Sequence, residues 1–205
     1  MAKKKASEEI SLADKIKLFH LDKGYLNTNH IIAGIDPSLQ KTGLIIMNGK
    51  GQILCEELIK PKKLAGIERL KFIKDQLLSF LKVYNVTVVA IESYSFGSRG
   101  RATFSLGELG GVLRLSLLEN KYPYFDVSPS SLKSFIAENG AADKEMMRQA
   151  VKRKYSLDIK EDNICDAFCL SRMCLILGDS MPKYCAKGGS ELFKKIRIKH
   201  KMILQ

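Results

Sequence analysis

The sequence predicts an α/β fold, in which a mixed sheet of five strands is flanked by helices. Apolar, β-branched runs of six to eight residues are bounded by turn residues, and they alternate with longer segments whose apolar residues recur at helical spacing. The segments come in the order of three strands, a helix, a strand, a helix, a strand and then helices. That order is typical of helices packed on the faces of a mixed sheet.

The first three strands are predicted at residues 30–35, 42–47 and 52–59. A turn signal, "NGKG", separates the second from the third, so we expect the sheet to open as an antiparallel meander. Two further apolar runs, at residues 86–91 and 122–127, complete the five strands.

The helices of the core are predicted from apolar spacing and from capping residues. They are expected at residues 64–84, 105–119, 129–138, 143–155 and from 161 or 162 to 177. The helix at 105–119 contains Gly107, Gly110 and Gly111, although glycine costs about 1 kcal/mol relative to alanine inside a helix. We expect these glycines to permit close approach of another backbone, which makes this helix our candidate dimer surface.

The charge distribution predicts three parts: an N-terminal helical extension at 1–28, a core domain at 29–178 and a basic tail at 179–205. The net charge is +12, and residues 180–205 supply half of it, with seven Lys/Arg against one Glu. A basic chain of this kind predicts a polyanionic partner, with nucleic acid ahead of a membrane surface.

The sequence also argues against membrane and secreted classes. No stretch approaches the roughly 18 consecutive apolar residues of a membrane span, and the lysine-rich start lacks the apolar segment of a secretory signal. The five cysteines include no CxxC pair, and Cys165, Cys169 and Cys174 fall in an apolar helical pattern. Such cysteines are typical of buried thiols in a reducing compartment, so we expect a cytoplasmic protein.

Two of the predicted buried strands end on carboxylates, Asp36 and Glu92. A charge at the end of an apolar strand is costly unless something binds it, and the two strand ends meet if the strands lie side by side. Farther along, Asp162 and Asp166 share one face of the last helix at i,i+4, and Asn163 reaches the same face.

Converging carboxylates repel one another, so the pattern predicts a divalent cation among them. The candidate ligands are Asp36, Glu92, Asp162, Asn163 and Asp166. Two such ions roughly 4 Å apart would form the clamp that enzymes use for phosphodiester cleavage.

For most of these residues, a purely structural role is an alternative to metal binding. Such roles are a turn begun by Asp36-Pro37, an ion pair of Glu92 with Arg99 or Arg101, and a helix cap formed by Asp162. Asp166 resists such an explanation because it lies within "ICDAFCL", which should be core.

Five stretches of the sequence resemble, in order, the successive motifs of RuvC-type Holliday junction resolvases, especially their phage-encoded branch. They are "GIDPSLQKTG", "AIESYSFGSRG", "GELGGVLRL", "SPSSLKSFIAENGAADKEMM" and "DNICDAFCL", and the resemblance extends over about residues 30–177. The resemblance implies an RNase H-like fold, a homodimer, Mg²⁺ or Mn²⁺ and no small-molecule cofactor. It also implies symmetric nicking of four-way DNA junctions, the branched substrate of the family.

The resemblance also implies roles for individual residues. Asp36, Glu92 and Asp166 match three acids of the family site, whereas Asn163 stands where the family commonly has an acid or histidine. We therefore predict the nearest carboxylate, Asp162, as the fourth catalytic ligand, with Asn163 as its rival through a neutral oxygen.

Two lysines and a loop complete the predicted site. Lys133 and Lys144 match family lysines close to the scissile phosphate or the DNA backbone, where a cation stabilises developing charge; the alternative is a solvated helix face. The loop after Glu92 interleaves aromatic and basic residues that suit unstacked bases and phosphates, although Tyr94 is as well explained by packing into the core. These candidate DNA-binding residues are Tyr94, Phe96, Arg99 and Arg101.

The sequence thus predicts a metal-dependent endonuclease for four-way and other branched DNA. Two alternatives are an RNase H-like nuclease of other specificity and a non-catalytic protein that binds branched DNA. The second is disfavoured because a pure binder gains nothing from carboxylates clustered against phosphates.

Overall fold

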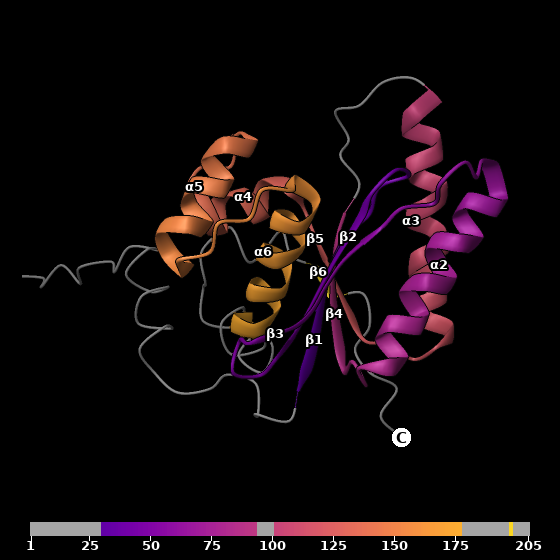
Figure 1. Cartoon of the computed structure of the whole chain (residues 1–205), viewed down its shortest axis with the longest axis horizontal. Helices are drawn as coiled ribbons and strands as arrows, with labels where there is room; N and C mark the ends of the chain where they lie inside the picture. The colour runs from indigo at the N-terminus through magenta and orange to yellow at the C-terminus, as the bar shows by residue number, and fades with distance from the viewer. Residues whose placement is uncertain (1–29, 94–100, 178–196, 199–205) are drawn as a thin grey trace, which may run out of the picture.

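The computed structural model describes residues 30–93, 101–177 and 197–198 (Figure 1). The predicted N-terminal extension and nearly all of the predicted basic tail therefore lie outside the described residues. The predicted division into three parts stays a prediction.

All five predicted strands are present, in a mixed sheet of order β3-β2-β1-β4-β5-β6. Strand β1 is antiparallel to β2 and parallel to β4, while β2 and β3 form the predicted antiparallel meander. The sixth strand is a two-residue addition that pairs antiparallel with β5 at the edge. The strands are β1 (Ile31–Asp36), β2 (Thr42–Asn48), β3 (Ile53–Ile59), β4 (Val88–Glu92), β5 (Tyr124–Val127) and β6 (Arg197–Ile198).

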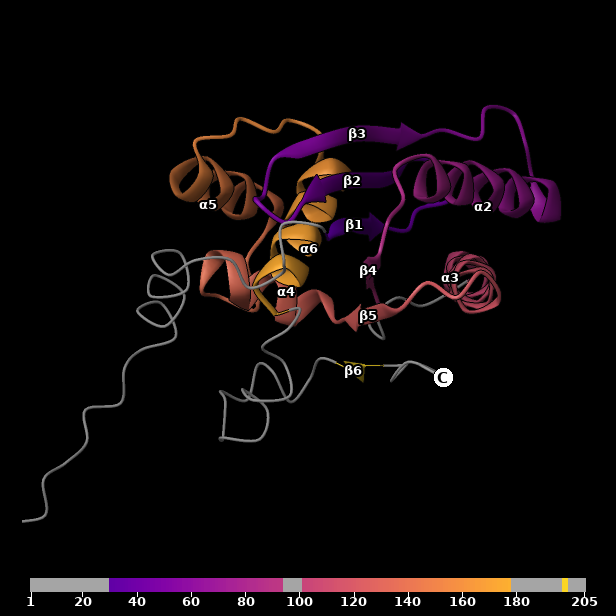
Figure 2. The same ribbon diagram turned by 90° about the horizontal axis from the view of Figure 1, so that it is seen from below.

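The helices form a layer on each face of the sheet, as Figure 2 shows from below. Helices α2 and α3 pack on one face, and α4, α5 and α6 pack on the other. They are α2 (Gly66–Val83), α3 (Arg101–Glu119), α4 (Pro129–Ala137), α5 (Lys144–Tyr155) and α6 (Asp162–Leu177).

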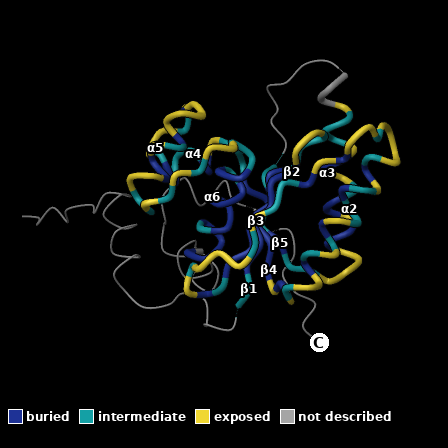
Figure 3. Tube along the Cα trace, viewed as in Figure 1, coloured by how far each residue is buried: buried dark blue, intermediate teal, exposed yellow. Residues whose placement is uncertain are grey.

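Strand side chains alternate between these two layers, because successive residues of a strand point to opposite faces. In β1, Ile32 packs toward α6, whereas Ala33 and Ile35 pack toward α2 and α3. The buried residues of Figure 3 accordingly follow the strands and the inner sides of the helices. By the same alternation, Asp36 and Glu92 both face the α6 layer.

Helix boundaries lie within one or two residues of the prediction except at the start of α3. Asp143 caps α5 as predicted, since its side chain accepts a hydrogen bond from the amide of Met146. Helix α4 ends one residue early, because Glu138 adopts a left-handed conformation with φ of 61°. Helix α3 begins at Arg101 instead of residue 105, so the predicted loop after Glu92 is shorter than its composition suggested.

The prediction of buried cysteines is confirmed in the described residues. Cys165, Cys169 and Cys174 are buried in the core as free thiols. None of the helices in the described ranges combines the length and apolar character needed to cross a bilayer.

Candidate active site

Parallel pairing brings the two strand-end carboxylates together. Residues 32–35 of β1 pair in register with residues 88–91 of β4, so Asp36 and Glu92 each stand one residue beyond the pair Ile35–Ile91. Both side chains face α6, and their carboxyl groups share a hydrogen bond. The prediction that these two strand ends meet is confirmed.

Helix α6 lies directly on this corner of the sheet because two glycines make room for it. A Cβ atom added to Gly34 would overlap the carbonyl oxygen of Ala167, and one added to Gly43 would overlap that of Asn163. Sequence reasoning missed both glycines, although glycine inside a strand signals close approach of another backbone. The absence of a side chain at these two positions allows the first turns of α6 to pack against β1 and β2.

Asp166 projects from α6 toward Asp36 and Glu92, and the three carboxyl groups perturb one another. Burial, joined by the charges of Asp36 and Asp162, raises the pKa of Asp166 from 3.8 to about 7. Burial likewise raises the pKa of Asp36, and burial together with the charge of Asp36 raises the pKa of Glu92 well above its usual range. Three acids that resist ionisation in one place form a site where a cation would be strongly favoured.

Asp162 and Asn163, the two candidates for the fourth ligand position, make different contacts in the first turn of α6. Asn163 Nδ2 donates a hydrogen bond to Asp36 Oδ2 over 2.7 Å. Asp162 instead accepts from Lys144 Nζ at 2.8 Å and from Arg148 Nη1 at 2.6 Å. The hydrogen bond from Lys144 is the main cause that lowers the pKa of Asp162. Asn163 therefore contacts the carboxylate pair, while Asp162 contacts the cations of α5.

The two predicted lysines border this cluster from different helices. Lys133, on α4, is half-buried, and its charge opposes the raised pKa values of Glu92 and Asp166, which burial dominates. Lys144 opens α5, is largely exposed and pairs with Asp162. Arg148 was not predicted, although its position one turn after Lys144 places it on the same helix face.

Glu92 contacts an arginine that was not among its predicted partners. Arg114 of α3 donates from Nη2 to the main-chain oxygen of Glu92, and its guanidinium forms a buried ion pair with Asp126. Tyr94, Phe96 and Arg99 lie outside the described residues, and Arg101 is placed only as the first residue of α3.

The donor set fits a divalent cation in chemistry, since carboxylate and amide oxygens are the ligands that Mg²⁺ and Mn²⁺ take. Within the described ranges, however, no three His, Cys, Asp or Glu side chains are already arranged to hold one ion. A hydrogen bond between the carboxyl groups of Asp36 and Glu92 requires a proton on one of them. Binding of a cation would replace that proton by a charge of the same sign.

Comparison with known proteins gives the family. The model of the family "Crossover junction endodeoxyribonuclease RuvC" matches residues 32–173. Relatives with that name include one from Caldicellulosiruptor saccharolyticus, 29% identical over 165 residues, with 75% of this chain and 96% of the relative covered. Another, from Alkaliphilus oremlandii, is 31% identical over 147 residues, which cover 69% of this chain and 90% of the relative.

Solved structures share the fold. The structure described as T. thermophilus RuvC in complex with Holliday junction substrate superposes with a TM-score of 0.64 at 22% identity, covering 74% of this chain and 96% of its own. The yeast mitochondrial Holliday junction resolvase Ydc2 gives 0.53 at 15% identity, with 87% and 90% covered. The predicted RNase H-like fold is confirmed. Because the matched family model spans every element that carries the clustered carboxylates, the chain belongs to the RuvC family of crossover junction endodeoxyribonucleases.

Proposed function

We propose that this protein is a metal-dependent, structure-selective endonuclease that nicks four-way DNA junctions and other branched DNA during recombination and repair. The observation that carries the proposal is the meeting of Asp36 and Glu92 on adjacent parallel strands with Asp166 of α6. Membership of the RuvC family supports the same activity.

Asp36, Glu92 and Asp166 would hold Mg²⁺ or Mn²⁺, and the carboxylates are numerous enough to share two ions. When bound, such ions activate water and neutralise charge on the transferred phosphate. The protein's own contribution is the rigid corner formed by β1, β4 and α6, which fixes the acids before the substrate arrives. Glu92 and Asp166 must lose protons as cations bind, so metal affinity depends on pH.

We propose Asn163 as the neutral fourth ligand, in place of the Asp162 that the sequence analysis preferred. Asn163 already contacts Asp36, and rotation of its amide would present the oxygen in place of the nitrogen. Asp162 would have to give up two ion pairs to reach an ion. Its role in this proposal is to hold Lys144 and Arg148 at the edge of the site.

Lys133 and Lys144 would face the DNA from the α4 and α5 side. Lys133 lies near Glu92 and Asp166, where its charge would stabilise a phosphate in reaction. Lys144 is exposed enough to meet the DNA backbone. We retain Tyr94, Phe96, Arg99 and Arg101 as candidate contacts to unstacked bases and phosphates at the branch point.

We also propose a homodimer formed through α3. Phe104, Leu115 and Leu118 are apolar but 78%, 55% and 45% exposed. Together with Glu108 and the exposed Gly111, these residues recur at alternating spacings of four and three. This spacing is typical of the contact line, or seam, between two packed helices. An added Cβ on Gly107 or Gly111 meets no atom within 4 Å, so these glycines leave room for a partner helix. A two-fold dimer would present two sites to the two strands of a symmetric junction.

A nicking assay tests the proposal. Four-way, three-way, flap and linear duplex DNA are incubated with Mg²⁺ and the parent chain, Asp36→Asn, or the control Glu56→Gln, which removes an exposed charge on β3. We expect the parent and the control to cut the four-way junction in preference to linear duplex, and Asp36→Asn to cut neither. Equal cutting of all substrates contradicts junction selectivity, and activity in Asp36→Asn contradicts the metal site.

A further inference from the structure

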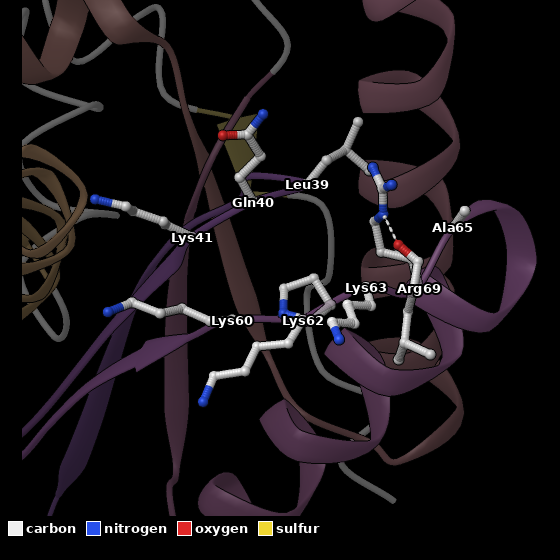
Figure 4. Close-up of a pocket in the computed structure, with 10 residues that line it drawn as sticks. Leu39, Gln40, Lys41, Lys60, Lys62, Lys63, Ala65 and Arg69 are labelled. Carbon is white, nitrogen blue, oxygen red and sulfur yellow. Dashed lines mark hydrogen bonds between the residues drawn. The ribbon is translucent and has the colours of Figure 1, made fainter.

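A basic pocket lies beside the active site, where the loop between β1 and β2 meets the loop between β3 and α2. Its volume is about 460 Å³ (Figure 4). It is lined by Leu39, Gln40, Lys41, Lys60, Pro61, Lys62, Lys63, Leu64, Ala65 and Arg69. We call it the lysine pocket.

Half of the lining residues are cations, and none is acidic. Lys41 pairs with Glu161 at 3.2 Å, and Arg69 donates from Nε to the carbonyl oxygen of Leu64 at 2.8 Å. Lys60, Lys62 and Lys63 form no ion pair with any residue that the structure describes. Positive side chains held close together without counter-charges repel one another, and an anionic ligand would relieve that repulsion.

The turn that presents these lysines has a fixed shape. The amide of Lys62 donates to the oxygen of Lys60 at 2.9 Å, and the amide of Leu64 donates to the oxygen of Pro61 at 3.1 Å. Lys63 takes a left-handed φ of 58°, a conformation that favours glycine over lysine. The backbone therefore adopts an unfavourable conformation at Lys63, a position that places this lysine beside Lys60 and Lys62.

The pocket and the carboxylates share one end of the sheet. Asp36 pairs with Gly43, and Thr42 pairs with Ile59, so Lys41 and Lys60 directly adjoin paired strand ends. Two strand spacings separate β1 from β3, which is about 10 Å. Figure 4 shows the side chains of Lys41, Lys60 and Lys62 extending to the same side of the turn, and the Lys41–Glu161 pair ties that side to the residue before α6.

We propose that the lysine pocket binds backbone phosphates of the DNA arm that leaves the active site across β2 and β3. This inference rests on the proposed nuclease function and extends it, because it gives the substrate a direction over the protein. Each strand of a duplex carries one phosphate per about 3.4 Å of axis. A separation of about 10 Å therefore puts the contacted phosphates about three nucleotides from the scissile one.

Salt-dependent binding tests the pocket. Binding of a four-way junction is measured without divalent metal, so that no cutting occurs, for the parent, Lys60→Gln/Lys62→Gln and the control Lys50→Gln/Lys82→Gln. The control removes the same charge from exposed lysines at the opposite end of the sheet. Each lost phosphate contact should reduce the slope of log affinity against log salt by about 0.9. We expect a slope smaller by about 1.8 for the pocket variant and no comparable change for the control.

Two further arms separate binding from folding and fix the location. Lys63→Gly removes a charge and relieves the left-handed backbone, so the slope should fall by about 0.9 while the thermal midpoint does not fall. Junctions with neutral methylphosphonate linkages about three nucleotides from the cut should bind the parent more weakly. The same linkages should weaken binding by Lys60→Gln/Lys62→Gln less, because this variant keeps only part of the pocket's charge, including that of Lys63.

The outcomes distinguish this inference from the function on which it rests. If the parent cuts junctions with Mg²⁺ but the pocket and control variants bind DNA alike, the pocket inference is overturned and the nuclease function stands. The same holds if neutral linkages weaken the pocket variant as much as the parent. A parent chain that binds DNA through the pocket but cuts nothing overturns the proposed function alone, and one that binds no junction overturns both.

Discussion

The guanidinium of Arg114 on α3 donates a hydrogen bond to the main-chain oxygen of Glu92 at 2.9 Å, and the same nitrogen pairs with Asp126 at 2.6 Å. Arg114 is 8% exposed and Asp126 is 7% exposed. One buried side chain therefore ties the end of β4, which carries Glu92, to β5 and to α3. Because α3 also carries the candidate dimer seam, Arg114 connects that seam to the carboxylate cluster.

Arg114→Met should lower both stability and nicking. Breaking a buried ion pair by removing one partner costs about 3–5 kcal/mol, since the remaining charge stays buried. Adding Asp126→Leu should restore most of the free energy of unfolding, because no buried charge is then left alone. Nicking should remain low in the double variant, since the contact to Glu92 is still missing.

Denaturant unfolding and single-turnover nicking on the same preparations measure the two effects. Recovery of nicking together with stability in the double variant would mean that Arg114 does not position Glu92.

Asp36→Asn should raise stability while it abolishes nicking. Burial raises the pKa of Asp36, so its ionised form destabilises the folded state, whereas an amide can still bond to Asn163 and Glu92. In chelator at neutral pH, we expect the free energy of unfolding to rise by about 1–3 kcal/mol. Urea titration with EDTA measures this, and the exposed control Glu56→Gln should change stability little. A less stable Asp36→Asn would show that the carboxylate is not under electrostatic strain.

Stability should depend on pH through Asp166. Its pKa rises on folding from 3.8 to about 7, so the folded state binds its proton more tightly than the unfolded state does. The stabilising contribution is complete below 3.8, declines as the pH rises toward 7, and is lost above it. Relative to Asp166→Asn, the parent should lose free energy of unfolding across this window in chelator.

Unfolding measured at several pH values for both chains checks this prediction. A constant difference from pH 4 to pH 8 would rule out a raised pKa at Asp166. With subsaturating Mg²⁺, nicking by the parent should increase through the same window, because cations compete with that proton.

The first turn of α6 gives a test of the fourth ligand. Asn163→Asp should lower the Mg²⁺ concentration for half-maximal nicking several-fold, because it adds a carboxylate beside Asp36. Asp162→Asn should change that concentration much less, through the loss of its charge near Asp166 alone, but should weaken DNA binding, because Lys144 and Arg148 lose their shared partner. Metal titrations of the nicking rate separate these results. The reverse pattern would restore Asp162 as the ligand.

The α3 seam makes a prediction about assembly. Leu115→Arg should convert a dimer to monomers, because it replaces one of the three exposed apolar side chains of the seam by a charged one. Ile67→Arg is the matched control, since Ile67 is 73% exposed on α2 and lies outside the seam. Sedimentation velocity over a concentration series measures the change. Dissociation by both variants, or by neither, would place the dimer contact elsewhere.

Most of the fold could be predicted from the sequence because its elements follow local rules. Apolar runs gave the strands, and Asp143 marked the start of α5 through its capping geometry. The meeting of Asp36 with Glu92 needed one further assumption, that β1 and β4 are neighbours, which the register confirms. The start of α3 could not be predicted as well, because its first residues lack apolar periodicity.

Contacts of long polar side chains could not be predicted, since sequence spacing does not fix them. Asp162 and Asn163 are adjacent in sequence, yet one faces the cations of α5 and the other bonds to Asp36. Arg114 was overlooked because a basic residue in an apolar helix carries no sign of its partner, which lies twelve residues away on β5. Gly34 and Gly43 are visible in the sequence, but only the structure shows that they allow α6 to pack closely on the sheet.

Helix α6 belongs both to the hydrophobic core and to the carboxylate cluster, with Cys169 and Leu170 buried one turn from Asp166. The enzyme therefore has no loosely attached catalytic segment within the described core that could melt ahead of the rest. On heating, loss of cutting should coincide with cooperative unfolding instead of preceding it. Residual activity after a heat pulse would then be proportional to the fraction of molecules that are still folded.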